Sequence, residues 1–215
     1  MKYKLTDETK EFFGKVLHRI VCVKAFEYVD VGETGGWVES ENNLSQDGYA
    51  WVSGNAQVYG NAQVSGNAKV SGNAQVYGDA WLSGNAQVYG NALVYGNALV
   101  YGDAQVSGYA QVYGNAKVSG YALVSGDAQV YGNAKVSGYA QVMSQNDYIV
   151  LKNTWSSGRY FTYTASNGKW SVGCFYGTGD ELVAKAFNDS ELSGKCYEAS
   201  VKFVAELERI KKEAK

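Results

Sequence analysis

The chain has 215 residues, a formal net charge of −2, 46% hydrophobic residues and no proline. This length is sufficient for a sizeable core, and the near-neutral charge argues against a nucleic-acid binder, which needs a basic stripe, and against an acidic mimic of DNA. No stretch of 18 apolar residues occurs and the first residues are polar, so we expect neither a membrane span nor a signal peptide.

The first 51 residues predict two different structures. Residues 1–30 contain two strand-like runs separated by Gly14 and Lys15, which indicates a β-hairpin. Residues 31–51 predict an irregular first coil of a repeat domain. In that coil Val31, Val38 and Leu44 have the spacing expected of inward-pointing residues.

Residues 52–143 repeat with a period of six and without an insertion. The repeated unit is Ala–x–Val–x–Gly–Asn, with an occasional Leu for Val and Asp or Tyr for Asn. Ala–x–Val–x reads as a four-residue strand with Ala and Val on one side, and Gly–Asn reads as a corner. So short a strand must stack on copies of itself, which predicts a solenoid with three sides and 18 residues per coil. The 90 residues from Val52 to Val142 then form five coils.

The repeat resembles the hexapeptide-repeat family, whose core pattern is aliphatic–x–x–x–small–x. Residues Val58, Tyr59, Gly60, Asn61, Ala62 and Gln63 show that pattern. The resemblance implies a left-handed parallel β-helix of triangular section, and hence a mainly β protein with residues 31–145 as the β-helix. A pentapeptide-repeat helix is excluded because it needs a period of five.

The outward-pointing residues differ between the three predicted faces. One face has a tyrosine in every coil, which predicts a column formed by Tyr59, Tyr77, Tyr95, Tyr113 and Tyr131. A second apolar group surrounds the corner at Gly96 and contains Trp81, Leu93, Leu99 and Tyr101. Stacked tyrosines could simply stabilise adjacent coils, but tyrosine is also favoured at protein interfaces. We take both groups as candidate partner-binding or self-association surfaces.

Residues 146–215 lose the repeat and predict a small β-β-β-α-α module. The expected strands are 147–155, 158–165 and 169–177, with Asn167 and Gly168 as a hairpin turn. A helix over 182–187 follows the capping pattern of Thr178 and Glu181, and a second helix starts at about residue 194. On that helix, one face contains Tyr197, Val201, Val204 and Leu207. Because a solenoid exposes strand edges at its ends, we interpret the hairpin and this module as caps, with partner binding by the module as the alternative.

The sequence offers little for catalysis. His18 is its single histidine, so a three-histidine zinc site is excluded, and a hexapeptide acyltransferase would need a histidine base and loops that the repeat region lacks. Cys22, Cys174 and Cys196 have no metal-ligand spacing and indicate a reduced, intracellular protein. We therefore expect no enzyme activity, no cofactor and no metal.

A closer resemblance concerns both ends of the chain. The segments 4–9, 17–20, 35–40 and 43–45 are similar to the opening of hexapeptide-repeat proteins encoded by bacteriophages and prophages, and 173–178 is similar to their end. This resemblance implies a protein of the bacterial cytoplasm that binds a host or phage protein, inhibition of a host defence protein being one form. The alternatives are a hexapeptide-type acyltransferase and a structural or self-assembling component.

Overall fold

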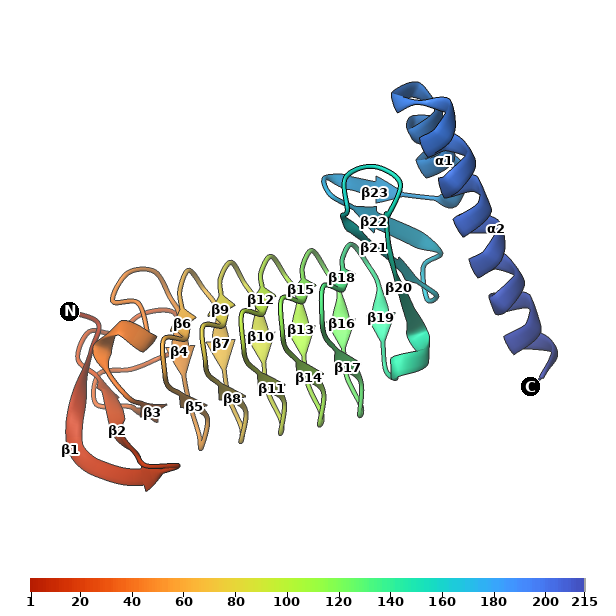
Figure 1. Ribbon diagram of the computed structural model, residues 1–215. Helices are drawn as coiled ribbons and strands as arrows, with labels where there is room; N and C mark the ends of the chain where they lie inside the picture. The colour runs from red at the N-terminus through yellow and green to blue at the C-terminus, as the bar shows by residue number, and fades with distance from the viewer. Residues whose placement is uncertain (215) are drawn as a thin grey trace.

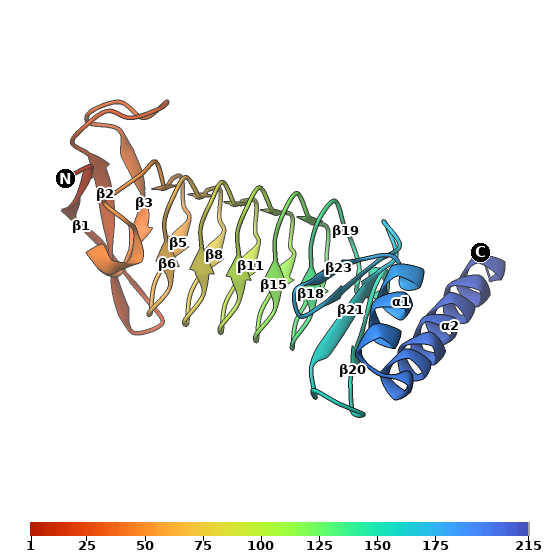
Figure 2. The same cartoon turned by 90° about the horizontal axis from the view of Figure 1, so that it is seen from above.

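A computed structural model, which describes residues 1–214, shows a β-solenoid shaft with a hairpin at its start and an α+β module at its end (Figure 1). The mainly β fold with 18-residue coils is confirmed, while the left-handed sense of the coil stays a prediction from the resemblance. The view from above shows the same straight stack of coils (Figure 2). Within residues 1–214 no helix is both long enough and apolar enough to cross a membrane.

Three parallel sheets form the faces of the shaft, and each strand pairs with the strand 18 residues away. The first face continues from the N-terminal strands into β5 (Gln57–Val58), β8 (Gln75–Val76), β11 (Leu93–Val94), β14 (Gln111–Val112) and β17 (Gln129–Val130). The second face contains β4 (Trp51–Val52), β7 (Lys69–Val70), β10 (Gln87–Val88), β13 (Gln105–Val106), β16 (Leu123–Val124) and β19 (Gln141–Val142). The third contains β6 (Gln63–Val64), β9 (Trp81–Leu82), β12 (Leu99–Val100), β15 (Lys117–Val118) and β18 (Lys135–Val136). The six strands of the second face exceed the five predicted coils because β19 starts a further one.

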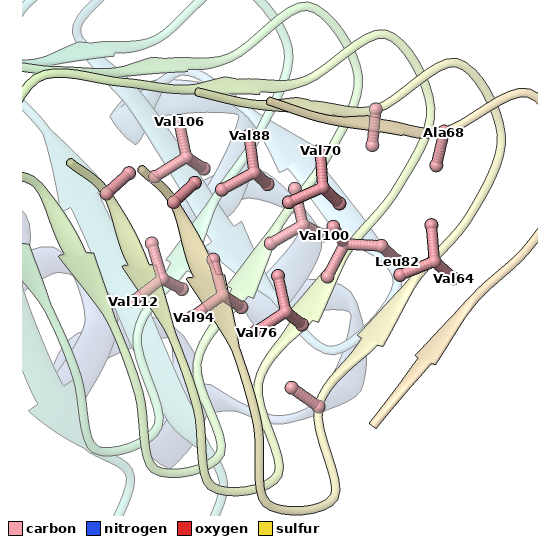
Figure 3. Packing of buried hydrophobic residues seen from close by; sticks show 14 of the residues in the cluster. Val64, Ala68, Val70, Val76, Leu82, Val88, Val94, Val100, Val106 and Val112 are labelled. Carbon is pink, nitrogen blue, oxygen red and sulfur yellow. The ribbon is translucent and has the colours of Figure 1, made fainter. Parts of the chain in front are cut away.

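The core of the regular coils is built mainly from alanine and valine, with Leu82 in one valine position. From Ala50 to Val142, the alanine and the valine or leucine of every repeat are buried, and the valine side chains point into the interior (Figure 3). Burying one valine contributes about 1.5–3 kcal/mol, so the regular period itself supplies the hydrophobic driving force. The predicted inward positions are confirmed along the repeat.

The strands are shorter than predicted because alanine belongs to the turn. Ala56 N donates to Ser53 O across 3.3 Å, which closes a four-residue turn through Gly54 and Asn55. At these corners the glycine has a positive φ, for example 64° at Gly54, whereas none of the corner asparagines does. Glycine therefore supplies the left-handed conformation that the turn needs, and only two residues per side remain in regular strand.

Backbone hydrogen bonds run along the shaft with one polarity. Gln57 N donates to Ala74 O at 3.0 Å and Tyr59 N donates to Val76 O at 3.0 Å, and this pattern recurs in every coil. In these bonds between coils, the N–H groups point toward the C-terminal end and the carbonyl groups point toward the N-terminal end. Without caps, the shaft would expose unpaired carbonyl groups at its N-terminal end and unpaired N–H groups at its C-terminal end.

The N-terminal segment extends the first face. β1 (Tyr3–Phe12) and β2 (Lys15–Cys22) form an antiparallel hairpin, β2 pairs with β3 (Thr34–Val38), and β3 pairs in parallel with β5. A short 3-10 helix, η1 (Glu41–Asn43), follows. Val38 and Leu44 are fully buried as predicted, but Val31 is 65% exposed. The prediction for Val31 is wrong because residues 23–33 form a separate loop before the first coil.

The C-terminal module contains four strands and two helices after η2 (Gln145–Asp147). β20 (Tyr148–Lys152), β21 (Tyr160–Thr164), β22 (Lys169–Val172) and β23 (Phe175–Gly177) form an antiparallel sheet. The predicted third strand is two strands because Gly173, with φ of 57°, reverses the chain. The helices α1 (Gly179–Asp189) and α2 (Glu191–Glu213) begin earlier than predicted because Thr178 and Ser190 cap them.

Candidate binding surface

The predicted tyrosine column is a continuous stack of rings on the first face. Successive ring centroids lie 5.0, 4.9, 4.9 and 5.3 Å apart from Tyr59 to Tyr131, with interplanar angles of 3°, 1°, 1° and 11°. The coil spacing of parallel strands sets this separation, and it falls within the range of favourable aromatic pairs. We call this column the tyrosine ladder. It is about 20 Å long because it spans four coil steps.

Glutamine side chains lie beside three of the ladder hydroxyls. The hydroxyls of Tyr59, Tyr95 and Tyr113 lie 3.4–3.5 Å from a glutamine Oε1 of the next coil, at the outer limit of hydrogen bonding. Leu93 replaces the glutamine above Tyr77 and interrupts this series. Stacking between the rings is therefore the main contact that orders the ladder.

The ladder is not equally accessible along its length. Tyr59 is only 8% exposed because Leu17, Trp37 and Phe12 of the N-terminal segment pack around it, whereas Tyr131 is 45% exposed. Burial raises the pKa of Tyr59 to about 12, with a further contribution from the neighbouring Tyr77. Burial also raises the pKa of Tyr77 and that of Tyr95. The accessible part of the ladder therefore begins at Tyr77.

Hollows border the ladder at both ends. At the N-terminal end, Phe13 and Lys15 from the tip of the β1–β2 hairpin lie beside Tyr77 and Leu93 around a hollow of about 470 Å³. At the other end, a hollow of about 510 Å³ lies between Tyr131 and residues of the C-terminal module, which include Tyr148, Val150 and Tyr160. Both caps thus add aromatic residues to the same face.

The second predicted group occupies two adjoining faces. Trp81 and Leu99 pair in register on the third face, and Leu93 lies between Gln75 and Gln111 on the first. Trp81 is 50% exposed and Tyr101 is 42% exposed, whereas both leucines are partly buried. The apolar group is therefore a broken patch, which continues onto the ladder only through Leu93.

The structure also shows exposed tyrosines that the sequence analysis did not select. Tyr121 and Tyr139 stack with centroids 5.1 Å apart along a shaft edge, and Tyr109 is 66% exposed. Each replaces the asparagine that follows the corner glycine, so sorting that position by coil would have found them. They form isolated ridges, in contrast to the five-ring ladder.

Side chains that could catalyse a reaction or bind a metal are sparse near this surface. His18 lies on β2 with Nδ1 3.4 Å from Thr6 O, and among residues 1–214 no three side chains of histidine, cysteine, aspartate or glutamate gather as a metal site would require. The arrangement suits recognition, since it combines a rigid aromatic face with neutral hydrogen-bonding groups.

The fold and this face together define a β-solenoid repeat protein with a column of stacked tyrosines on one face. The shaft is similar to the YdcK beta solenoid repeat, whose family model matches residues 56–69, 62–78, 86–102, 94–108, 110–126 and 128–143. The matched segments lie within the shaft and include neither the hairpin nor the C-terminal module. No curated protein matches the chain.

Proposed function

We propose that this protein is a non-enzymatic binding scaffold that engages a protein partner along the tyrosine ladder. The observation that carries this proposal is the parallel stack of rings from Tyr59 to Tyr131 on one flat face. The shaft between residues 50 and 145 carries only three lysines and three aspartates, so a neutral surface faces the partner. Such a surface recognises by shape and aromatic contact, which is typical of the central part of protein interfaces.

Rigidity supports the same proposal. Binding normally has to immobilise side chains, at about 0.5–1.5 kcal/mol for each flexible one. The ladder rings are already stacked on one another, so they lose little freedom when a partner docks. The hollows beside Phe13 and Tyr160 would accept groups that project from the partner at either end.

The biological setting of the proposal comes from the sequence. The similarity of residues 35–40 to openings of phage and prophage proteins favours a host or phage protein of the bacterial cytoplasm as partner, with inhibition of a defence protein as one form. A second copy of the chain is the alternative partner, and Trp81, Leu93, Leu99 and Tyr101 are the apolar residues that favour it.

The test replaces Tyr77, Tyr95 and Tyr113 together by serine. Serine is already present at this repeat position on the other faces, for example at Ser65 and Ser119, so we expect the shaft to stay folded. Affinity for a partner purified with the wild-type chain should fall by more than about 2 kcal/mol, the scale of interface hot spots. Calorimetry measures the affinity, and circular dichroism verifies the fold.

The matched control removes three exposed tyrosines elsewhere by the changes Tyr109→Asn, Tyr121→Asn and Tyr139→Asn. Partner affinity should stay unchanged in this control. Equal loss in both triple variants, or none in the ladder variant, would contradict the ladder as the contact surface. Sedimentation of the Leu93→Lys, Leu99→Lys double variant tests the alternative, because self-association through that patch should then disappear.

A further inference from the structure

A separate cavity lies away from the ladder and its two hollows, between the second face of the shaft and the loop of residues 23–33. Its volume is about 300 Å³, at the lower end of the range for small-ligand pockets. The loop supplies Phe26, Glu27, Tyr28 and Val29, and the shaft supplies side chains from three successive coils. The cavity shares no lining residue with the ladder or its two hollows.

The loop wall is a preformed structure. Phe26 and Val29 exchange two backbone hydrogen bonds of 3.1 and 2.8 Å, which places Glu27 and Tyr28 at the tip of a tight turn. Glu27 adopts φ of 42°, a left-handed conformation that is uncommon for glutamate. The ring of Phe26 then stacks on Tyr49 at 6.4 Å and meets Trp51 edge-on at 5.6 Å. These aromatic contacts fix the wall against the shaft.

The charges in the lining neutralise each other. Lys69 Nζ lies 2.9 Å from Glu27 Oε2, and it also lies 5.7 Å from the centroid of the Tyr28 ring. Lys69 and Glu27 are the two charged residues among those that line the cavity. A cationic ligand would compete with Lys69 for Glu27, and an anionic ligand would compete with Glu27 for Lys69. The cavity therefore favours a neutral ligand.

The remaining polar groups suit a ligand with several hydroxyls. Ser53 and Ser71 occupy successive coils about 4.8 Å apart, and Gln87 follows on the next coil. Tyr89 adds an aromatic side chain whose hydroxyl lies 3.3 Å from Oε1 of Gln105.

We propose that this cavity binds a neutral saccharide of one or two units. The aromatic side chains of Phe26 and Tyr89 offer apolar surface to the C–H face of a sugar ring, while Ser53, Ser71 and Gln87 offer hydrogen bonds to its hydroxyls. The three coils span about 10 Å, which limits the ligand to a short saccharide.

The test measures binding of glucose, N-acetylglucosamine, cellobiose and chitobiose to the full chain by saturation-transfer NMR and calorimetry. We expect at least one of these probes to bind. The variants Tyr89→Ser and Lys69→Gln should weaken that binding at least about tenfold. Both use a residue that the repeat already places in the same column, at Ser71 and Gln87, so the fold should persist.

The control variant Tyr139→Asn removes an exposed tyrosine on a different edge and should bind the same probe with unchanged affinity. The proposal is overturned when none of the four saccharides gives saturation transfer at millimolar concentration, or when a bound saccharide is insensitive to Tyr89→Ser. Adenosine serves as a planar comparison ligand. Binding of adenosine without binding of any saccharide would show that the ligand is not a saccharide.

Discussion

At the scale of single residues, the corner glycines decide whether coils can stack. A Cβ at Gly96, where φ is 68°, would lie 3.0 Å from the backbone N of Gly114 in the next coil. Gly132 has the same role in the last coil with φ of 65°, yet no atom of residues 1–214 lies within 4 Å of a Cβ built there. Alanine at either position would have the same left-handed strain. Only at Gly96 would its Cβ also crowd the next coil.

This pair gives the first prediction. Gly132→Ala should cost about 1–2 kcal/mol from backbone strain alone. Gly96→Ala should cost at least about 1 kcal/mol more, because the methyl group overpacks the junction between coils. Thermal melting followed by circular dichroism compares the two variants. Equal melting temperatures would show that strain, and not contact between coils, explains the glycine at every corner.

At the scale of elements, the buried tyrosines make the shaft less stable at alkaline pH. Burial raises the pKa of Tyr59 and that of Tyr148 to about 12, while tyrosine in an unfolded chain titrates near a pKa of about 10. Between these values the unfolded chain has lost protons that the folded chain retains, so ionisation favours unfolding. The stabilisation is complete below pH 10 and is lost as the pH rises toward 12.

We therefore predict that the melting temperature falls between about pH 10 and 12. Lys2 acts in the opposite direction between pH 8 and 10.5, because burial lowers its pKa to about 8, so the fall should be shallow near pH 10 and steepen toward pH 12. Phenolate absorbance of the folded protein checks the assignment. If all 18 tyrosines titrated together near pH 10 while the chain stayed folded, the burial argument would be wrong.

The elements also show what the sequence can and cannot predict. The period of six determines the register, so the buried valines, the glycine corners and the tyrosine ladder follow from counting. Val31 and the 23–33 loop have no repeat to place them, because their position depends on contacts between residues far apart in the chain. The cover over Tyr59 and the cavity beside Trp51 arise from such contacts, and no local pattern encodes them.

At the scale of the whole molecule, each cap matches the backbone polarity of the end it covers. At the N-terminal end, where carbonyl groups are exposed, donors arrive from Lys2 Nζ to Ala50 O at 2.8 Å and from Asn43 Nδ2 to Gly60 O and Ala62 O at 2.9 Å each. At the C-terminal end, the N–H groups of Lys135 and Gln141 donate to Thr162 Oγ1 at 2.9 Å and Ser166 Oγ at 2.7 Å. Met143 N donates to Asp147 Oδ2. Side chains thus take the place of a further coil and pair the backbone groups that a bare strand edge would offer to another chain.

The cap at Asn43 gives the last prediction. Asn43 is fully buried, so Asn43→Ala should leave two carbonyl groups unpaired and cost about 2–4 kcal/mol of stability. Asn55→Ala is the control, because the exposed Asn55 side chain contacts only Asn73 at 3.3 Å, and its cost should stay within about 0.5 kcal/mol. Urea unfolding measures both. A loss for Asn43→Ala no larger than the control would show that the end cap contributes nothing.

The axial direction of the backbone hydrogen bonds has a mechanical consequence. A force that pulls the two ends of the shaft apart acts along those bonds and loads every junction between coils equally, so the weakest junction opens first. Each coil should then peel away separately, and each would release 18 residues of chain, a contour length of roughly 60 Å. A sideways force meets three faces packed on a continuous valine core and has no such weak direction. The shaft is therefore a rod that resists bending but yields to tension in equal steps.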